Sequence, residues 1–124
     1  MKRYIHGACS CDDPSHDFSN GSFYSLFVGL HDGCGEPQVM SLRQARTFAE
    51  KVCAHYFVNG YTILEGMGAD RGTPDKLEPS IYIMAINATE NDVFWAADIL
   101  QREFRQSEIL IERNQTRYLY FNNR

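Results

Sequence analysis

The order of apolar strands and amphipathic helices limits the fold of this chain more than any other feature of its sequence. An apolar strand is expected over residues 22–30, and an amphipathic helix follows over residues 41–57. Two further strands are expected over residues 61–65 and 80–87, joined by the glycine-rich loop 66–79. A second helix and a final strand come after them. The chain is therefore expected to follow the order β-α-β-β-α-β.

Both expected helices begin at residues that can cap them. Ser41 precedes the first helix, and Gln44 three residues later completes a capping box. Thr89 can cap a second helix that reaches about Phe104. Apolar residues recur at helical spacing, which predicts one buried stripe on each helix: Leu42, Ala45, Ala49, Val52, Cys53 and Tyr56 on the first, and Val93, Ala96, Ala97, Leu100 and Phe104 on the second.

The two ends of the chain are less regular. Residues 1–21 are polar and are expected to form an arm, followed by one domain over residues 22–124. A strand is expected over residues 108–113, where Asn114 and Gln115 turn the chain. The segment 116–121 would then be an extra edge strand or an arm that reaches another subunit.

These elements predict an α+β fold of the ferredoxin-like class. Two βαβ-like halves with right-handed crossovers give a four-stranded antiparallel sheet with both helices on one face. The strand residues that point away from the helices are also apolar in this sequence. Because an exposed apolar sheet face usually marks an interface, we expect a homo-oligomer of at least two copies.

Composition excludes several classes of partner. The formal net charge of −4 gives no basic footprint for duplex nucleic acid. No apolar run approaches the roughly 18 residues that a bilayer-spanning helix needs, so no membrane association is expected. The first residues contain no apolar stretch typical of a signal peptide, which favours a cytoplasmic location. Disulfides are accordingly not expected among Cys9, Cys11, Cys34 and Cys53.

Short motifs along the chain resemble a known family. Residues 24–30 form an opening strand that ends near a Gly-Leu pair, residues 57–62 combine Phe, Gly and Thr at a helix exit, and residues 78–80 place Glu and Ser before the next strand. In this order they resemble the DUF3574 family of small bacterial domains, over residues 23–121. Ala69 stands where that family usually has tryptophan. The resemblance implies the same fold and carries no known activity.

The loop between the two middle strands is the leading candidate for a ligand site. Gly66 and Gly68 allow the backbone to approach a ligand and to offer N–H groups to an anion. Arg71 can clamp a phosphate or carboxylate, and Glu65 and Glu78 flank the loop. Together they suit a small anionic ligand, such as a nucleotide. The alternative is a solvated hairpin loop whose charged residues form weak surface pairs.

The turn after the first strand contains candidates for catalytic residues. His31 and Cys34 could act as base and nucleophile, with Asp32 orienting the imidazole. The weak acid–base candidates are therefore His31, Glu65 and Glu78. An ordinary turn explains the same residues, because Cys/His pairs in enzymes are usually assembled from distant segments.

The N-terminal arm contains possible metal ligands. Neutral imidazole and thiolate are suitable ligands for zinc, and the arm contains His6, Cys9, Cys11 and His16. Their spacing does not match a standard zinc finger. A polar arm without metal explains the composition equally well, so no cofactor is required and zinc is kept as an alternative.

Three functions remain open from the sequence. The first is an oligomeric protein that holds a small anionic metabolite or signalling nucleotide, and such a protein could sequester its ligand as phage-encoded sponges do. The second is a protein-interaction module or inhibitor that uses the open sheet face and the aromatic C-terminal arm. The third is a small acid–base enzyme with a cavity between subunits. The first is preferred, because no convincing catalytic set is present.

Overall fold

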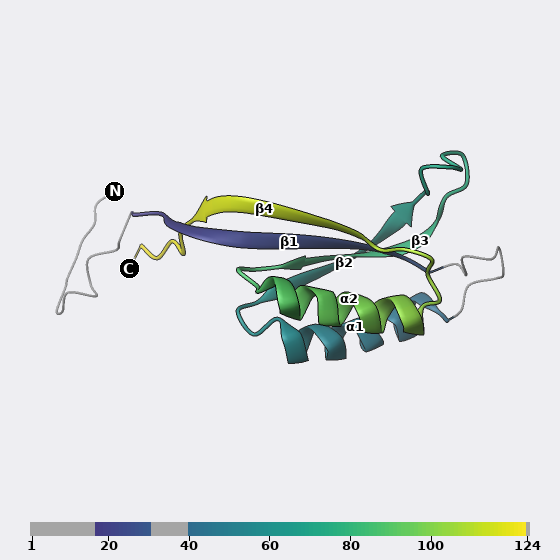
Figure 1. Cartoon of the computed structure of the whole chain (residues 1–124), viewed down its shortest axis with the longest axis horizontal. Coiled ribbons are helices and arrows are strands. Elements are labelled where there is room, and N and C mark those ends of the chain that lie inside the picture. The colour runs from purple at the N-terminus through teal and green to yellow at the C-terminus, as the bar shows by residue number, and fades with distance from the viewer. Residues whose placement is uncertain (1–16, 31–39, 124) are drawn as a thin grey trace. The chain divides into compact units, whose positions relative to one another are not determined.

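The computed structural model describes residues 17–30 and 40–123. The six elements follow the predicted order: β1 (Ser19–Gly29), α1 (Leu42–Tyr56), β2 (Tyr61–Gly68), β3 (Glu78–Ala85), α2 (Glu90–Glu103) and β4 (Leu110–Tyr118). The strands form one antiparallel sheet in the order β2-β3-β1-β4. Both helices cover the same side of the sheet (Figure 1). This is the ferredoxin-like fold that the sequence predicts.

The chain divides into two compact units. The central unit contains Ser22–Asn114. The described part of the terminal unit contains residues 17–21 and 115–123. Within the terminal unit, the guanidinium of Arg117 lies 5.9 Å from the ring centroid of Phe18. The rings of Tyr118 and Tyr120 lie edge to face at 5.7 Å. Aromatic contacts therefore hold this unit together.

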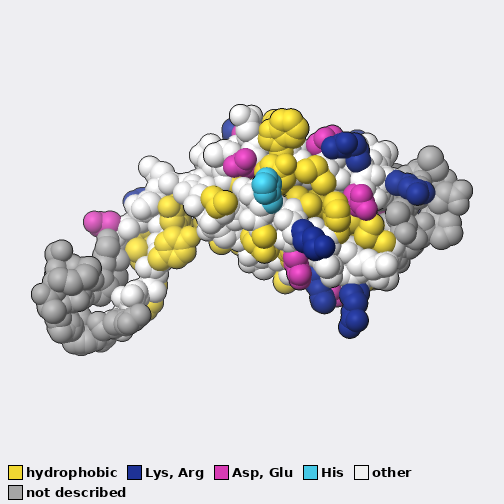
Figure 2. Space-filling model, turned by 90° about the horizontal axis from the view of Figure 1, so that it is seen from below, with side chains coloured by type: hydrophobic (Ala, Val, Ile, Leu, Met, Phe, Trp, Pro, Cys, Tyr) yellow, Lys and Arg dark blue, Asp and Glu magenta, His cyan; other side chains and the backbone are white. Residues whose placement is uncertain are grey.

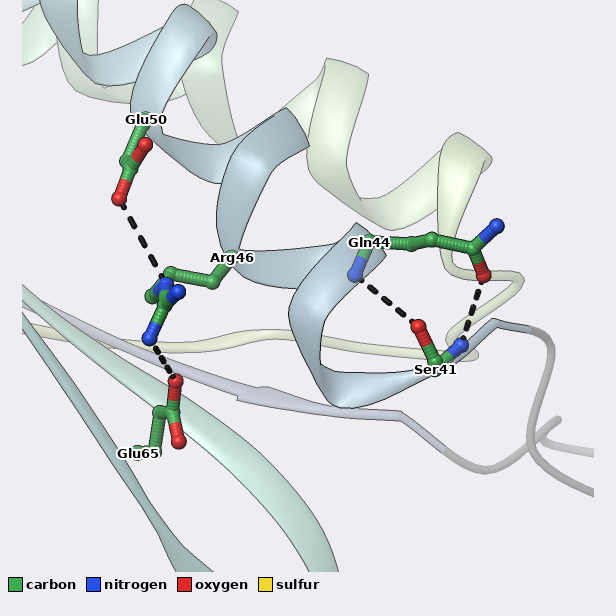
Figure 3. Close-up of polar contacts among 5 residues, drawn as sticks. All are labelled: Ser41, Gln44, Arg46, Glu50 and Glu65. Atoms are coloured by element: carbon green, nitrogen blue, oxygen red, sulfur yellow. Dashed lines mark hydrogen bonds and ion pairs between the residues drawn. The ribbon is translucent and has the colours of Figure 1, made fainter.

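The helix caps are those that the sequence predicts. Ser41 Oγ accepts a hydrogen bond of 3.1 Å from the backbone N–H of Gln44, and Gln44 Oε1 accepts one of 3.0 Å from the N–H of Ser41 (Figure 3). Thr89 Oγ1 accepts a hydrogen bond of 3.1 Å from the N–H of Asp92. These bonds satisfy donors that a helix leaves unpaired at its start. None of the helices in the described ranges combines the length and hydropathy of a bilayer-spanning helix.

The hydrophobic core of the central unit lies between the sheet and the two helices. Most residues of the predicted stripes are buried: Ala45, Ala49, Val52 and Cys53 on α1, and Val93, Ala96, Ala97 and Leu100 on α2. Leu42 and Tyr56 of the first stripe are half-buried and pack against this core. Sheet residues meet them from the other side: Leu26, Val28, Ile81, Ile83 and Ala85. Phe104 is 1% exposed and packs against Phe48 with ring centroids 5.8 Å apart. Each large side chain buried in this way contributes about 1.5–3 kcal/mol to stability.

The predicted loop between β2 and β3 is too long. Both strands continue into it, so that Gly66 lies opposite Ser80 and Gly68 lies opposite Glu78. The ladder with β3 holds these glycines in a strand although glycine is a poor strand former. The connection itself is limited to residues 69–77.

The predicted turn before the last segment is also wrong. Asn114 and Gln115 lie inside β4, which continues without interruption to Tyr118. β4 is hydrogen-bonded beside β1 in the sheet. The strand pairing therefore outweighs the weak turn preference of these two residues.

Candidate ligand-binding site on the open sheet face

The side of the sheet away from the helices, here called the open face, carries an apolar row across three strands. Leu64, Tyr82 and Phe27 lie directly opposite one another on β2, β3 and β1. The ring centroids of Phe27 and Tyr82 are 5.1 Å apart, a tilted geometry that aromatic pairs favour. Leu64 is 55% exposed and Phe27 is 41% exposed. The row formed by Leu64, Tyr82 and Phe27, here called the aromatic row after its two rings, offers an apolar surface on which a planar ring can stack.

A buried hydroxyl fixes one ring of the aromatic row. Ser25 is only 4% exposed, and its Oγ lies 2.8 Å from Oη of Tyr82. The hydrogen bond satisfies a polar group that would otherwise be costly to bury. It also restricts the position of the Tyr82 phenol beside Phe27.

A pocket of about 410 Å³ opens beside the aromatic row. Its walls come from the end of β1, the β2–β3 connection, and the segment that leads from α2 into β4. Figure 1 shows that the β2–β3 connection projects to the side of the sheet opposite the helices. The pocket is lined by Phe27, Gly29, Ala69, Asp70, Arg71, Gln106, Glu108, Ile109, Leu110 and Ile111. Its volume lies within the range typical of small-molecule sites.

At Gly29, two side chains approach the backbone of the pocket wall closely. A Cβ atom on Gly29 would collide with Oε1 of Glu78 and would lie 3.0 Å from Oε1 of Gln106. The absence of a side chain at Gly29 therefore leaves room for two oxygen atoms from distant segments. Both oxygens can accept hydrogen bonds from a ligand hydroxyl or amine.

Arg71 lies in the pocket wall and is already paired. Its Nη2 atom is 3.3 Å from Oε1 of Glu108, and the side chains are 88% and 63% exposed. An ion pair this exposed contributes little to stability. The pair nevertheless joins the β2–β3 connection to the segment before β4, across the pocket.

The structure separates the predicted ligand-binding residues. Arg71 lines the pocket, and the Glu78 carboxylate lies over Gly29. Glu65 lies elsewhere, because its Oε2 atom accepts a hydrogen bond of 2.7 Å from Nη1 of Arg46 on α1 (Figure 3). Gly66 lies in β2 with open space above it. Gly68 also lies in β2, where a Cβ atom would be 3.4 Å from Oγ of Ser80.

Other predicted residues lie outside the described ranges. The acid–base candidate His31 and its neighbours Asp32 and Cys34 fall in residues 31–39. The predicted zinc ligands His6, Cys9, Cys11 and His16 fall in residues 1–16. Among residues 17–30 and 40–123, no group of three or more His, Cys, Asp or Glu side chains is arranged to hold a metal ion.

Cys53 is a core residue in the described chain. It is fully buried on α1, and burial, with a smaller contribution from Glu50, raises the pKa of its thiol to about 12. The thiolate is therefore almost absent at neutral pH, and Cys53 is not a nucleophile.

A second hollow lies on the helix side of the sheet. Its volume is about 510 Å³, and it is lined by Met40, Arg43, Gln44, Thr47, Phe48, Lys51 and Glu103. Figure 2 views this side and shows acidic and basic side chains interspersed with hydrophobic ones. Mixed charges of this kind are typical of a solvated helix surface.

Several residues of the open-face pocket were not identified as site candidates from the sequence. In the sequence, Glu108 lies in a segment rich in charged residues, which indicates a solvated surface, and no motif surrounds Gln106. Gly29 carries a usable signal, since an isolated glycine inside an apolar strand indicates close approach of another group. The sequence alone does not say which group approaches.

Comparison with known proteins identifies relatives in fold only. No protein-family model and no curated protein matches this chain, so the DUF3574 resemblance stays a prediction. A phage SAM lyase in its apo state superposes with a TM-score of 0.54 at 16% identity, over 83% of this chain and 90% of that one. A phage SAM lyase in complex with S-methyl-5′-thioadenosine gives a TM-score of 0.51 at 16% identity, over 82% and 90%.

A regulatory protein shares the fold as well. CPII, a nitrogen regulatory PII-like protein from Thiomonas intermedia K12 bound to ADP, AMP and bicarbonate, superposes with a TM-score of 0.51. The identity is 16%, over 82% of this chain and 96% of that one. The central unit therefore has a fold found in both an enzyme and a regulatory protein, and function has to be argued from the site.

Proposed function

We propose that this protein binds a small nucleoside-containing ligand in the open-face pocket. The observation that carries the proposal is the aromatic row lying beside a pocket of about 410 Å³ that both polar and apolar residues line. Structures with this fold hold S-methyl-5′-thioadenosine in one case and ADP and AMP in another. An adenosine derivative is therefore the ligand class to test first.

In this proposal the two parts of the site have separate roles. The base stacks on the ring of Phe27 beside Tyr82, and such stacking suits any planar aromatic ring. The ribose hydroxyls donate hydrogen bonds to the carboxylates of Glu78 and Glu108. The anionic ligand expected from the sequence depends on Arg71 as a clamp, and Arg71 is paired with Glu108 here. An anionic metabolite or signalling nucleotide would compete with Glu108 for Arg71.

Calorimetry on the full chain tests this proposal. Titration with S-methyl-5′-thioadenosine, AMP and ADP is expected to give saturable binding for at least one of them. Phe27→Ala should weaken that binding about tenfold, since stacking on an aromatic side chain contributes roughly 1–3 kcal/mol per base. The matched control is Phe94→Ala on α2, which removes an exposed phenylalanine outside the pocket lining.

Incubation of the same protein with S-adenosylmethionine distinguishes binding from catalysis. An enzyme is the second candidate, favoured by the likeness to SAM lyase structures and by the Glu78 carboxylate at the pocket. Loss of S-adenosylmethionine over time, followed by mass spectrometry, would favour the enzyme. Absence of binding to all these compounds would contradict the proposed function.

We also propose that copies of the chain associate through the open face. Phe27, Leu64 and Leu110 are large exposed apolar side chains on this face of the sheet. Sedimentation equilibrium should give a mass of at least two chains, and Leu64→Lys should weaken association at least tenfold by placing a charge in the interface. Val58→Lys, at an exposed apolar residue outside the strands, should leave the mass unchanged. A wild-type monomer at all concentrations would contradict this prediction.

A further inference from the structure

We infer that the open-face pocket prefers a nucleoside that carries a positive charge to one that carries phosphate. The inference rests on the proposed function, because it concerns the charge of the ligand in the same pocket. It extends that proposal from the shape of the site to its electrostatics.

The charged side chains of the pocket are mainly acidic. Among the residues that the structure describes, Asp70, Arg71 and Glu108 line it, and these three carry one negative charge in excess at pH 7. The carboxylate of Glu78 reaches over the lining residue Gly29 and adds another negative charge. An acidic pocket concentrates cations and repels anions, and its walls strengthen both effects relative to open water.

Arg71, a basic residue of the pocket lining, already has an acidic partner. Nη2 of Arg71 lies 3.3 Å from Oε1 of Glu108. A phosphate bound at Arg71 would lie beside the carboxylate of Glu108 and near Asp70, the residue next to Arg71, and both negative charges would repel it. A cationic ligand is attracted to the carboxylates of Glu78 and Glu108, and it can approach them while Arg71 stays paired with Glu108. The pair therefore works against anionic ligands more than against neutral or cationic ones.

Three adenosine derivatives of similar shape separate the effect of charge from the effect of the base. They are 5′-amino-5′-deoxyadenosine, which is cationic at pH 7, neutral adenosine, and anionic AMP. Calorimetry with the full chain at low salt is expected to rank their affinities in that order. We expect the amine to bind about tenfold more tightly than AMP, and added salt to reduce this ratio.

A substitution in the pocket should change the ranking. Glu108→Gln removes one negative charge and leaves Arg71 without its carboxylate partner, so AMP should bind about tenfold more tightly than to the wild type. Glu50→Gln is the matched control, because it makes the same charge change on α1, on the helix side of the sheet. Glu50→Gln should leave the ratio of the affinities for 5′-amino-5′-deoxyadenosine and AMP unchanged.

The outcomes separate this inference from the proposal beneath it. Preference for the amine that Glu108→Gln reduces and Glu50→Gln does not would support the inference. Equal or tighter binding of AMP to the wild type would overturn it and leave nucleoside binding intact. If none of the three compounds binds, the proposed function is wrong and the charge preference falls with it.

Discussion

Replacing Gly29 with alanine is expected to weaken nucleoside binding at least thirtyfold, or about 2 kcal/mol, while the protein stays folded. The added Cβ would occupy the space of Oε1 of Glu78 and crowd Oε1 of Gln106. Both atoms are at the ends of flexible side chains, so they can move away without disturbing the backbone. The polar wall of the pocket would then change its geometry, and a ligand hydroxyl would lose its acceptors.

The sequence supplies a control for this substitution in the same row of the sheet. Gly66 and Gly29 both lie opposite Ser80, one on each side of β3. A Cβ on Gly66 meets no atom within 4 Å. Gly66→Ala should therefore preserve both binding and stability. Calorimetry with S-methyl-5′-thioadenosine and thermal unfolding of both variants would check the pair, and equal affinities for the two would remove Gly29 from the site.

Truncation of Phe104 is expected to have the largest effect on stability. Its ring is 1% exposed, packs against Phe48 and closes the C-terminal end of α2. Phe104→Ala removes this burial and leaves a cavity, which typically costs about 3–5 kcal/mol. A loss of this size approaches the whole stability of many domains. Urea unfolding followed by circular dichroism measures it directly.

Phe94 provides the matched control in the same helix. It is 54% exposed, so Phe94→Ala removes the same atoms with much less loss of buried surface. The change in unfolding free energy should stay below about 1 kcal/mol. Similar losses of unfolding free energy for Phe104→Ala and Phe94→Ala would contradict the buried position of Phe104 in the core.

The sequence was sufficient for the fold because its hydrophobic periods agree with the elements that form. Most residues of the two predicted helical stripes are buried, and Leu42 and Tyr56 at the ends of the first stripe are half-buried. The capping box at Ser41 fixes the start of α1 to the residue. The errors fall where strand pairing decides, at Gly66 and at Asn114, since pairing partners are distant in sequence and leave no local signal.

The site was harder to predict for the same reason. Arg71 and Glu78, which the glycine-rich connection between β2 and β3 indicated as candidates, both lie at the pocket. Gly29, Gln106 and Glu108 reach the pocket from other segments, and only the folded sheet brings them together. Glu65 lies on the other side of β2, where it pairs with Arg46, because successive strand residues point to opposite faces of a sheet.

The position of β1 in the sheet has a consequence for biosynthesis. β1 leaves the ribosome before the other strands, but its neighbours are β3 and β4, and its residue Leu26 is paired with Ile83. This apolar strand must therefore wait, without hydrogen-bonding partners, until much of the chain has been made. An unpaired apolar strand is a template for wrong contacts between nascent chains. Growth temperature and chaperone supply should accordingly influence the yield of folded protein more than they influence its final stability.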